Sequence, residues 1–118
     1  MWSSTMQILD KPISVDELRK IAADTFIDLV KAVVDVDKGL VAIDAELHSD
    51  LEALLLEKGS RQKDLWGVNF YPDIQGEDFI EFDSMINIRP SQGNMSRGVD
   101  SKEIQNKIIK IANSMVTR

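Results

Sequence analysis

The stretch VKAVVDVDKGLVAI, residues 30–43, decides the fold. Two runs rich in β-branched residues, 30–36 and 40–43, flank the turn sequence Asp37-Lys38-Gly39, and this pattern is typical of a β-hairpin. A hairpin joins two antiparallel strands. The sheet that grows from this hairpin is therefore expected to be mainly antiparallel.

Helices are predicted on both sides of the hairpin. Three capping boxes mark where they begin, because a serine or aspartate oxygen and an acid three residues later satisfy the first free N–H groups. The boxes are Ser14 with Glu17, Ser49 with Glu52, and Asp100 with Glu103. Gly59 is expected to end the second helix in a left-handed conformation. Apolar residues at helical spacing follow each box, most clearly Ile104, Ile108, Ile111, Ala112 and Met115 in the last helix.

Three further segments read as strands. Thr5–Leu9 is a short run, Leu65–Tyr71 places Trp66, Val68 and Phe70 on one face, and Phe79–Arg89 is the longest strand predicted. The two faces of this last segment differ in polarity, so one is expected to enter the core and the other to meet water or a ligand. The predicted fold is α+β, a mainly antiparallel sheet with three helices on one face, in the order β-α-β-β-α-β-β-α.

Length and composition restrict the class of protein. A chain of 118 residues indicates a single domain, 1–118. The formal net charge is −6; residues 1–58 contain 12 acidic and six basic residues, while residues 59–118 contain eight of each. This balance argues against nucleic acid and anionic membranes as partners. No cysteine, leader or apolar stretch of about 20 residues is present, so we expect a cytoplasmic protein that does not enter a membrane.

The loop that follows residue 88 is the strongest candidate site. Arg89, Ser91, Gln92, Asn94 and Arg97 bring guanidinium, hydroxyl and amide groups into nine residues. Such a density of donors suits a carboxylate, a phosphate or sugar hydroxyls. The alternative is structural: the polar side chains cap turns, and the arginines pair with acids such as Glu81 or Asp83.

An acidic set offers a second chemistry. Asp35, Asp44, Glu46 and His48 could bind a divalent ion and support a metal-assisted hydrolase. Their spacing matches no known ligand pattern, so the sequence assigns no metal ligand and no cofactor. The structural alternative is a solvated hairpin followed by acids that favour a helix N-terminus.

Motifs for enzymatic activity are missing from the sequence. His48 is the single histidine, and the chain has no Gly-x-Ser-x-Gly elbow, no Walker motif and no dinucleotide-binding glycine pattern. Nothing in the sequence requires that the protein be an enzyme.

The segment EFDSMINIRPSQGN, residues 81–94, with Ser96-Arg97 after it, resembles a small prokaryotic family known only as a domain of unknown function. Segments 33–36, 45–50 and 59–67 are similar to the same family. The resemblance implies a single-domain prokaryotic protein and brings no activity, substrate or cofactor. The family pattern includes residues 46–48, 60–62 and 89–97. We expect these three segments to form one polar pocket at one end of the sheet.

The function expected from the sequence is therefore binding. We expect a small cytoplasmic protein whose pocket or surface contacts a small polar or anionic ligand or a protein partner. Self-association through an exposed strand edge, Thr5–Leu9 or Leu65–Tyr71, is a third interpretation. The residues expected to make the contacts are Glu46, His48, Arg61, Gln62, Arg89, Ser91, Gln92, Asn94 and Arg97.

Overall fold

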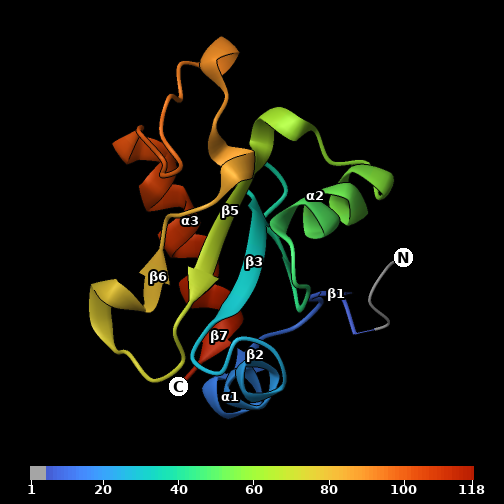
Figure 1. Ribbon diagram of the computed structural model, residues 1–118, viewed down its shortest axis with the longest axis vertical. Helices are drawn as coiled ribbons and strands as arrows, with labels where there is room; N and C mark the ends of the chain where they lie inside the picture. The colour runs from blue at the N-terminus through green and yellow to red at the C-terminus, as the bar shows by residue number, and fades with distance from the viewer. Residues whose placement is uncertain (1–4) are drawn as a thin grey trace.

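A five-stranded sheet forms the centre of the protein (Figure 1). The computed structural model describes residues 5–118. All neighbouring strands of this sheet are antiparallel, which confirms the α+β fold predicted from the hairpin. The strands follow one another across the sheet in the order β1 (Gln7–Ile8), β4 (Leu40–Ile43), β3 (Val30–Asp35), β5 (Leu65–Phe70) and β6 (Ile80–Glu81).

The three helices pack on two faces of this sheet, so the prediction that all share one face is wrong. They are α1 (Val15–Asp24), α2 (His48–Glu57) and α3 (Lys102–Met115). Helices α1 and α3 cover the first face, and α2 lies on the second (Figure 1). Two short parallel strands, β2 (Ile13–Ser14) and β7 (Val116–Thr117), join the beginning of α1 to the end of α3.

Alternation along the strands explains the two layers. Trp66, Val68 and Phe70 of β5 face α1 and α3, as their spacing predicted, and each is almost completely buried. Val33 and Leu65 face the other way and pack against Leu51 and Leu55 of α2. Because α2 has only ten residues, it covers only part of the second face.

The helix starts agree only partly with the predicted capping boxes. Ser14 caps α1, accepting a hydrogen bond of 3.1 Å from the Glu17 N–H, as expected. Helix α2 begins at His48 after Leu47, with no side-chain cap, so the box predicted at Ser49 is not formed. Ser101 rather than Asp100 caps α3. Gly59, with a φ of 100°, follows the end of α2 as predicted.

The long strand predicted for Phe79–Arg89 is wrong. Pairing stops after β6, and 3₁₀ turns follow at η3 (Met85–Asn87) and η4 (Pro90–Gln92). The Ser84 hydroxyl accepts a hydrogen bond of 3.3 Å from the Ile86 N–H, which favours a turn over a strand at this point. Two further 3₁₀ turns are η1 (Gln62–Asp64) and η2 (Gly76–Phe79).

The edges of the sheet also differ from expectation. Strand β5 lies between β3 and β6, so Leu65–Tyr71 is not a free edge as proposed for self-association. The short strand β1 lies at one edge, within the predicted segment Thr5–Leu9. Among residues 5–118, no helix is long and apolar enough to cross a membrane.

A close approach at Gly67 joins the η3 turn to β5. A Cβ added to Gly67 would lie 2.6 Å from both Cβ and Oγ of Ser84, and 3.1 Å from a side-chain carbon of Ile86. Real side chains do not approach so closely, and Ser84 is only 2% exposed. Glycine is therefore required here for space, because the turn packs directly on the backbone of the strand.

We expect Gly67→Ala to lower the free energy of unfolding by about 1–3 kcal/mol, because the new methyl group overpacks a closed contact. Urea denaturation measures this loss. Adding Ser84→Gly removes the two closest atoms and should restore part of the stability. An unchanged unfolding midpoint in Gly67→Ala would contradict the contact.

Candidate functional site

Arg89, expected to bind a ligand, is turned into the protein and is only 8% exposed. Its Nε donates to the Ile86 carbonyl at 3.0 Å, one terminal nitrogen donates to the Gln62 carbonyl at 2.7 Å, and the other donates to the Leu65 carbonyl. The guanidinium also lies over the Trp66 ring, 4.8 Å from its centroid. Arg89 thus connects the chain around η1 to the η3 turn.

Glu52 of α2 supplies the negative charge nearest to this guanidinium. Its Oε2 lies 3.6 Å from a terminal nitrogen of Arg89, and its side chain is 13% exposed. Burial raises the pKa of Glu52, and the charge of Arg89 opposes that rise. This buried pair belongs to the packing of α2 against the turn.

The side chain of Asn87 makes the hydrogen bonds to β5 that the backbone of a neighbouring strand would make. Its Oδ1 accepts a hydrogen bond of 2.8 Å from the Gly67 N–H, and its Nδ2 donates to the Gly67 carbonyl at 2.9 Å. The same Nδ2 donates to the Arg97 carbonyl at 2.9 Å. One fully buried amide therefore holds β5, the η3 turn and the far end of the loop together.

The side chain of Asn94 also binds backbone groups and so holds the two ends of the loop after residue 88 together. Its Nδ2 donates to the carbonyls of Asn87 at 2.8 Å and Gly98 at 2.9 Å, and its Oδ1 accepts from the Asp100 N–H at 2.8 Å. Gln92 reaches across to the Lys63 carbonyl at 3.1 Å. The polar side chains of this loop therefore satisfy backbone groups, which is the structural alternative considered for it.

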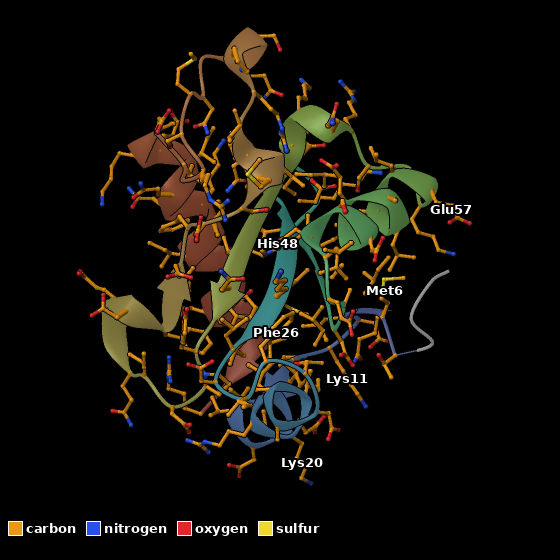
Figure 2. The ribbon with its side chains drawn as sticks, in the orientation of Figure 1. Met6, Lys11, Lys20, Phe26, His48 and Glu57 are labelled. Atoms are coloured by element: carbon orange, nitrogen blue, oxygen red, sulfur yellow. The ribbon has the colours of Figure 1, made fainter. Side chains whose placement is uncertain are left out.

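A cavity of about 520 Å³ lies elsewhere, on the part of the second sheet face that α2 leaves uncovered. Figure 2 shows His48 and Phe26 on this side of β3, the first at the start of α2 and the second on the loop after α1. The volume is in the range of small-molecule sites. Its lining residues are Phe26, Leu29, Lys31, Leu47, His48, Ser49, Asn69, Tyr71, Glu81, Asp83, Ser84, Met85, Ile86 and Arg97.

Three polar side chains form a row across the floor of this cavity. Lys31 of β3 lies opposite Asn69 of β5, and Asn69 lies opposite Glu81 of β6. Asn69 Nδ2 donates to Glu81 Oε1 at 2.9 Å, while Asn69 Oδ1 is buried on the side of His48. A cation, an amide and a carboxylate thus stand side by side on adjacent strands.

His48 forms the wall where α2 begins. Its Nε2 lies 2.8 Å from the Val68 carbonyl, and because a carbonyl only accepts, Nε2 carries the proton of the neutral ring. Burial lowers the pKa of His48; the Val68 carbonyl opposes this effect, the charge of Lys31 adds to it, and Asp83 and Asn69 oppose it. The helix N-terminus also disfavours a positive charge at this position. His48 therefore presents a neutral imidazole.

The remaining charged groups lie at the other side of the cavity. Arg97 Nε and Asp83 Oδ1 form an ion pair of 2.6 Å, so each neutralises the other. The Tyr71 hydroxyl donates to Glu81 Oε1 at 3.0 Å. Burial raises the pKa of Tyr71, and the neighbouring carboxylate of Glu81 raises it further. Tyr71 is consequently a neutral donor near pH 7.

The acidic set proposed for a metal-assisted hydrolase is dispersed. Both carboxylate oxygens of Asp35 are engaged, Oδ1 by the N–H groups of Asp37 and Lys38 and Oδ2 by the Ser60 hydroxyl. Burial raises the pKa of Asp44, and Glu46 is exposed. Among the described residues, no group of three or more acidic or histidine side chains could hold a metal ion.

The structure separates the residues expected to share one pocket. His48 and Arg97 line the cavity. The side chains of Arg89, Gln92 and Asn94 connect loops by hydrogen bonds, and Gln62 accepts one of these through its backbone carbonyl. Glu46, Arg61, Gln62 and Ser91 are exposed and do not line the cavity.

Sequence reasoning missed the floor of the cavity. Lys31 and Asn69 are polar residues that stand between apolar neighbours in β3 and β5, and this break in the apolar pattern could have indicated them. Glu81 and Asp83 were placed on the polar face of a strand but not assigned to a site. The register that brings Lys31, Asn69 and Glu81 into one row cannot be read from any single segment.

The chain belongs to the family described as protein of unknown function (DUF5674), whose model matches residues 7–115. The match supports the family resemblance of the sequence and covers every strand of the main sheet. No curated protein and no solved structure matches the chain. The function must therefore be inferred from the residues of the cavity.

We expect Arg89→Lys to lower the free energy of unfolding by about 2–3 kcal/mol, because one ammonium keeps the charge but cannot reach three separate carbonyls, which leaves buried acceptors unsatisfied. Urea denaturation measures the loss. Arg61→Lys is the matched control, since Arg61 is exposed, and its effect should stay within about 0.5 kcal/mol. A loss below about 1 kcal/mol in Arg89→Lys would show that Arg89 is not a structural residue.

Acidification should destabilise the protein through His48. Its pKa in the folded protein lies below the ordinary value of 6.5, so the unfolded chain binds the proton more readily as the pH falls through that value. His48→Gln removes this effect. The difference in free energy of unfolding between the wild-type protein and His48→Gln should shrink between about pH 7.5 and about pH 5. Carboxylates titrate in both proteins and cancel, so a constant difference would contradict a neutral, buried His48.

Proposed function

We propose that the protein is a cytoplasmic binding protein that holds a small polar molecule in the cavity on the open half of the second sheet face. The observation that carries the proposal is the row of Lys31, Asn69 and Glu81 across three strands. A sheet face built for packing alone would be apolar and covered, as the first face is. Here three polar side chains lie on the floor of a cavity of about 520 Å³.

The surroundings support a ligand smaller than a macromolecule. His48, Asn69 and Ser84 are buried, so the centre of the floor and one wall are shielded from water, while Lys31 is half-buried and Glu81 is exposed at its two ends. Burial strengthens the electrostatic contacts that a ligand makes there. Leu47 and Met85 at the cavity are exposed, at 55% and 65%, and offer apolar surface to a bound molecule. Apolar surface beside placed polar groups is typical of small-molecule sites.

The contacts of Asp35 also favour binding over metal-assisted hydrolysis. Catalysis of that kind needs several ligands around one ion, and Asp35 already uses both of its oxygens within the hairpin turn. We therefore assign the cavity a binding role and no metal.

Ser49→Trp tests the proposal, because Ser49 is an exposed residue that lines the cavity and a tryptophan there would fill it. A library of small polar compounds is screened by ¹H–¹⁵N NMR. We expect hits that shift the amide signals of His48, Asn69 and Glu81 and that are lost in Ser49→Trp.

The matched control is Ser91→Trp, since Ser91 is exposed but does not line the cavity, and it should bind as the wild type does. Hits that bind Ser49→Trp unchanged, shifts confined to other surfaces, or a screen without hits would each argue against a ligand in this cavity.

A further inference from the structure

The cavity floor contains one positive and one negative group that no ion pair neutralises. Within residues 5–118, neither Lys31 nor Glu81 forms an ion pair, whereas the other two charged residues of the cavity, Asp83 and Arg97, are paired at 2.6 Å. Lys31 Nζ lies 4.8 Å from the centroid of the Phe26 ring. Glu81 accepts hydrogen bonds through Oε1 from Asn69 and Tyr71.

The sheet keeps these two charges apart. Lys31 and Glu81 stand on β3 and β6, with β5 and its Asn69 between them. Two strand spacings of about 4.8 Å separate their Cα atoms by roughly 10 Å. Both side chains are long, so their charged ends can approach a molecule between them from opposite sides.

Asn69 lies between these two charges and is itself buried, at 6% exposed. Its Nδ2 donates to Glu81 Oε1, and its side chain also interacts with His48. Since Asn69 holds the strand between Lys31 and Glu81, a ligand that contacts both charges is centred over β5.

Apolar residues surround the charged floor. Phe26, Leu29, Leu47, Met85 and Ile86 line the cavity together with the polar row. Met85 is flexible and adapts to hydrocarbon groups of different shape. A ligand that fits both regions carries a positive group, a negative group and an apolar body.

Resting on the binding role proposed above, we infer that the ligand of this cavity is a zwitterion with an apolar body, an apolar amino acid or a short apolar peptide. Its carboxylate faces Lys31 and its ammonium faces Glu81. A simple anion or a simple cation makes only one of the two charge-assisted contacts, so it binds more weakly.

Leucine and two analogues that each lack one charge test this inference. The analogues are 3-methylbutylamine, which lacks the carboxylate, and 4-methylpentanoate, which lacks the ammonium. Binding is measured by NMR titration and calorimetry. We expect leucine or the dipeptide leucyl-leucine to bind at least tenfold more tightly than either analogue. The affinities of leucine and of leucyl-leucine, compared with each other, distinguish free amino acids from peptides.

Two variants assign the charges. Lys31→Met should weaken the binding of leucine and of 4-methylpentanoate but not that of 3-methylbutylamine. Glu81→Gln should weaken the binding of leucine and of 3-methylbutylamine but not that of 4-methylpentanoate. Lys63→Met and Glu77→Gln change exposed residues outside the cavity and serve as controls. Unfolding midpoints and ¹H–¹⁵N spectra verify that every variant is folded.

Two results would overturn the inference. If an analogue with one charge binds as tightly as both leucine and leucyl-leucine, the cavity binds small molecules but does not select a zwitterion. If neither leucine nor leucyl-leucine binds, the zwitterion is excluded, and hits from the compound library that Ser49→Trp abolishes would still support the cavity as a binding site.

Discussion

The side-chain amide of Asn87 holds together the parts on which the site depends. It pairs with both backbone polar groups of Gly67 and with the carbonyl of Arg97, at a part of β5 that the short strand β6 does not reach. The η3 turn is thereby fixed on β5, with Ser84, Met85 and Ile86 as one wall of the cavity. The turn touches α2 through Ile86 and through the pair of Arg89 and Glu52. Since α2 is short, the two elements together leave the polar row uncovered, and the cavity lies there.

Much of the fold follows from local patterns. The hairpin of residues 30–43, the burial of Trp66, Val68 and Phe70, and the apolar stripe of α3 were all predicted, because alternation and helical spacing depend on neighbours along the chain. The extent of the strand after residue 79 was not. Alternation continues through Ile88, yet Ser84 and Asn87 bind backbone groups and turn the chain, and such side-chain competition depends on a partner as distant as Gly67.

Less of the candidate site than of the fold could be predicted from the sequence. A loop dense in arginine, asparagine and glutamine suggests a ligand, but the same donors satisfy the carbonyls of an irregular backbone, and in the structure Arg89, Gln92 and Asn94 do so. Of the residues expected to bind, His48 and Arg97 reach the cavity. Lys31, Asn69 and Glu81 come from three strands, and only the register between those strands shows that they adjoin.

Hydrogen exchange of the Gly67 amide, followed by NMR, tests the role of Asn87 most directly. The Gly67 N–H is bonded to a side chain, Asn87 Oδ1, at 2.8 Å. If Asn87 closes the edge of β5, this amide exchanges as slowly as the core amides of β3 and β5, through global unfolding only. Exchange at the rate of an exposed turn amide would show that the η3 turn is not fixed on the strand, and the cavity wall that depends on it would then be lost.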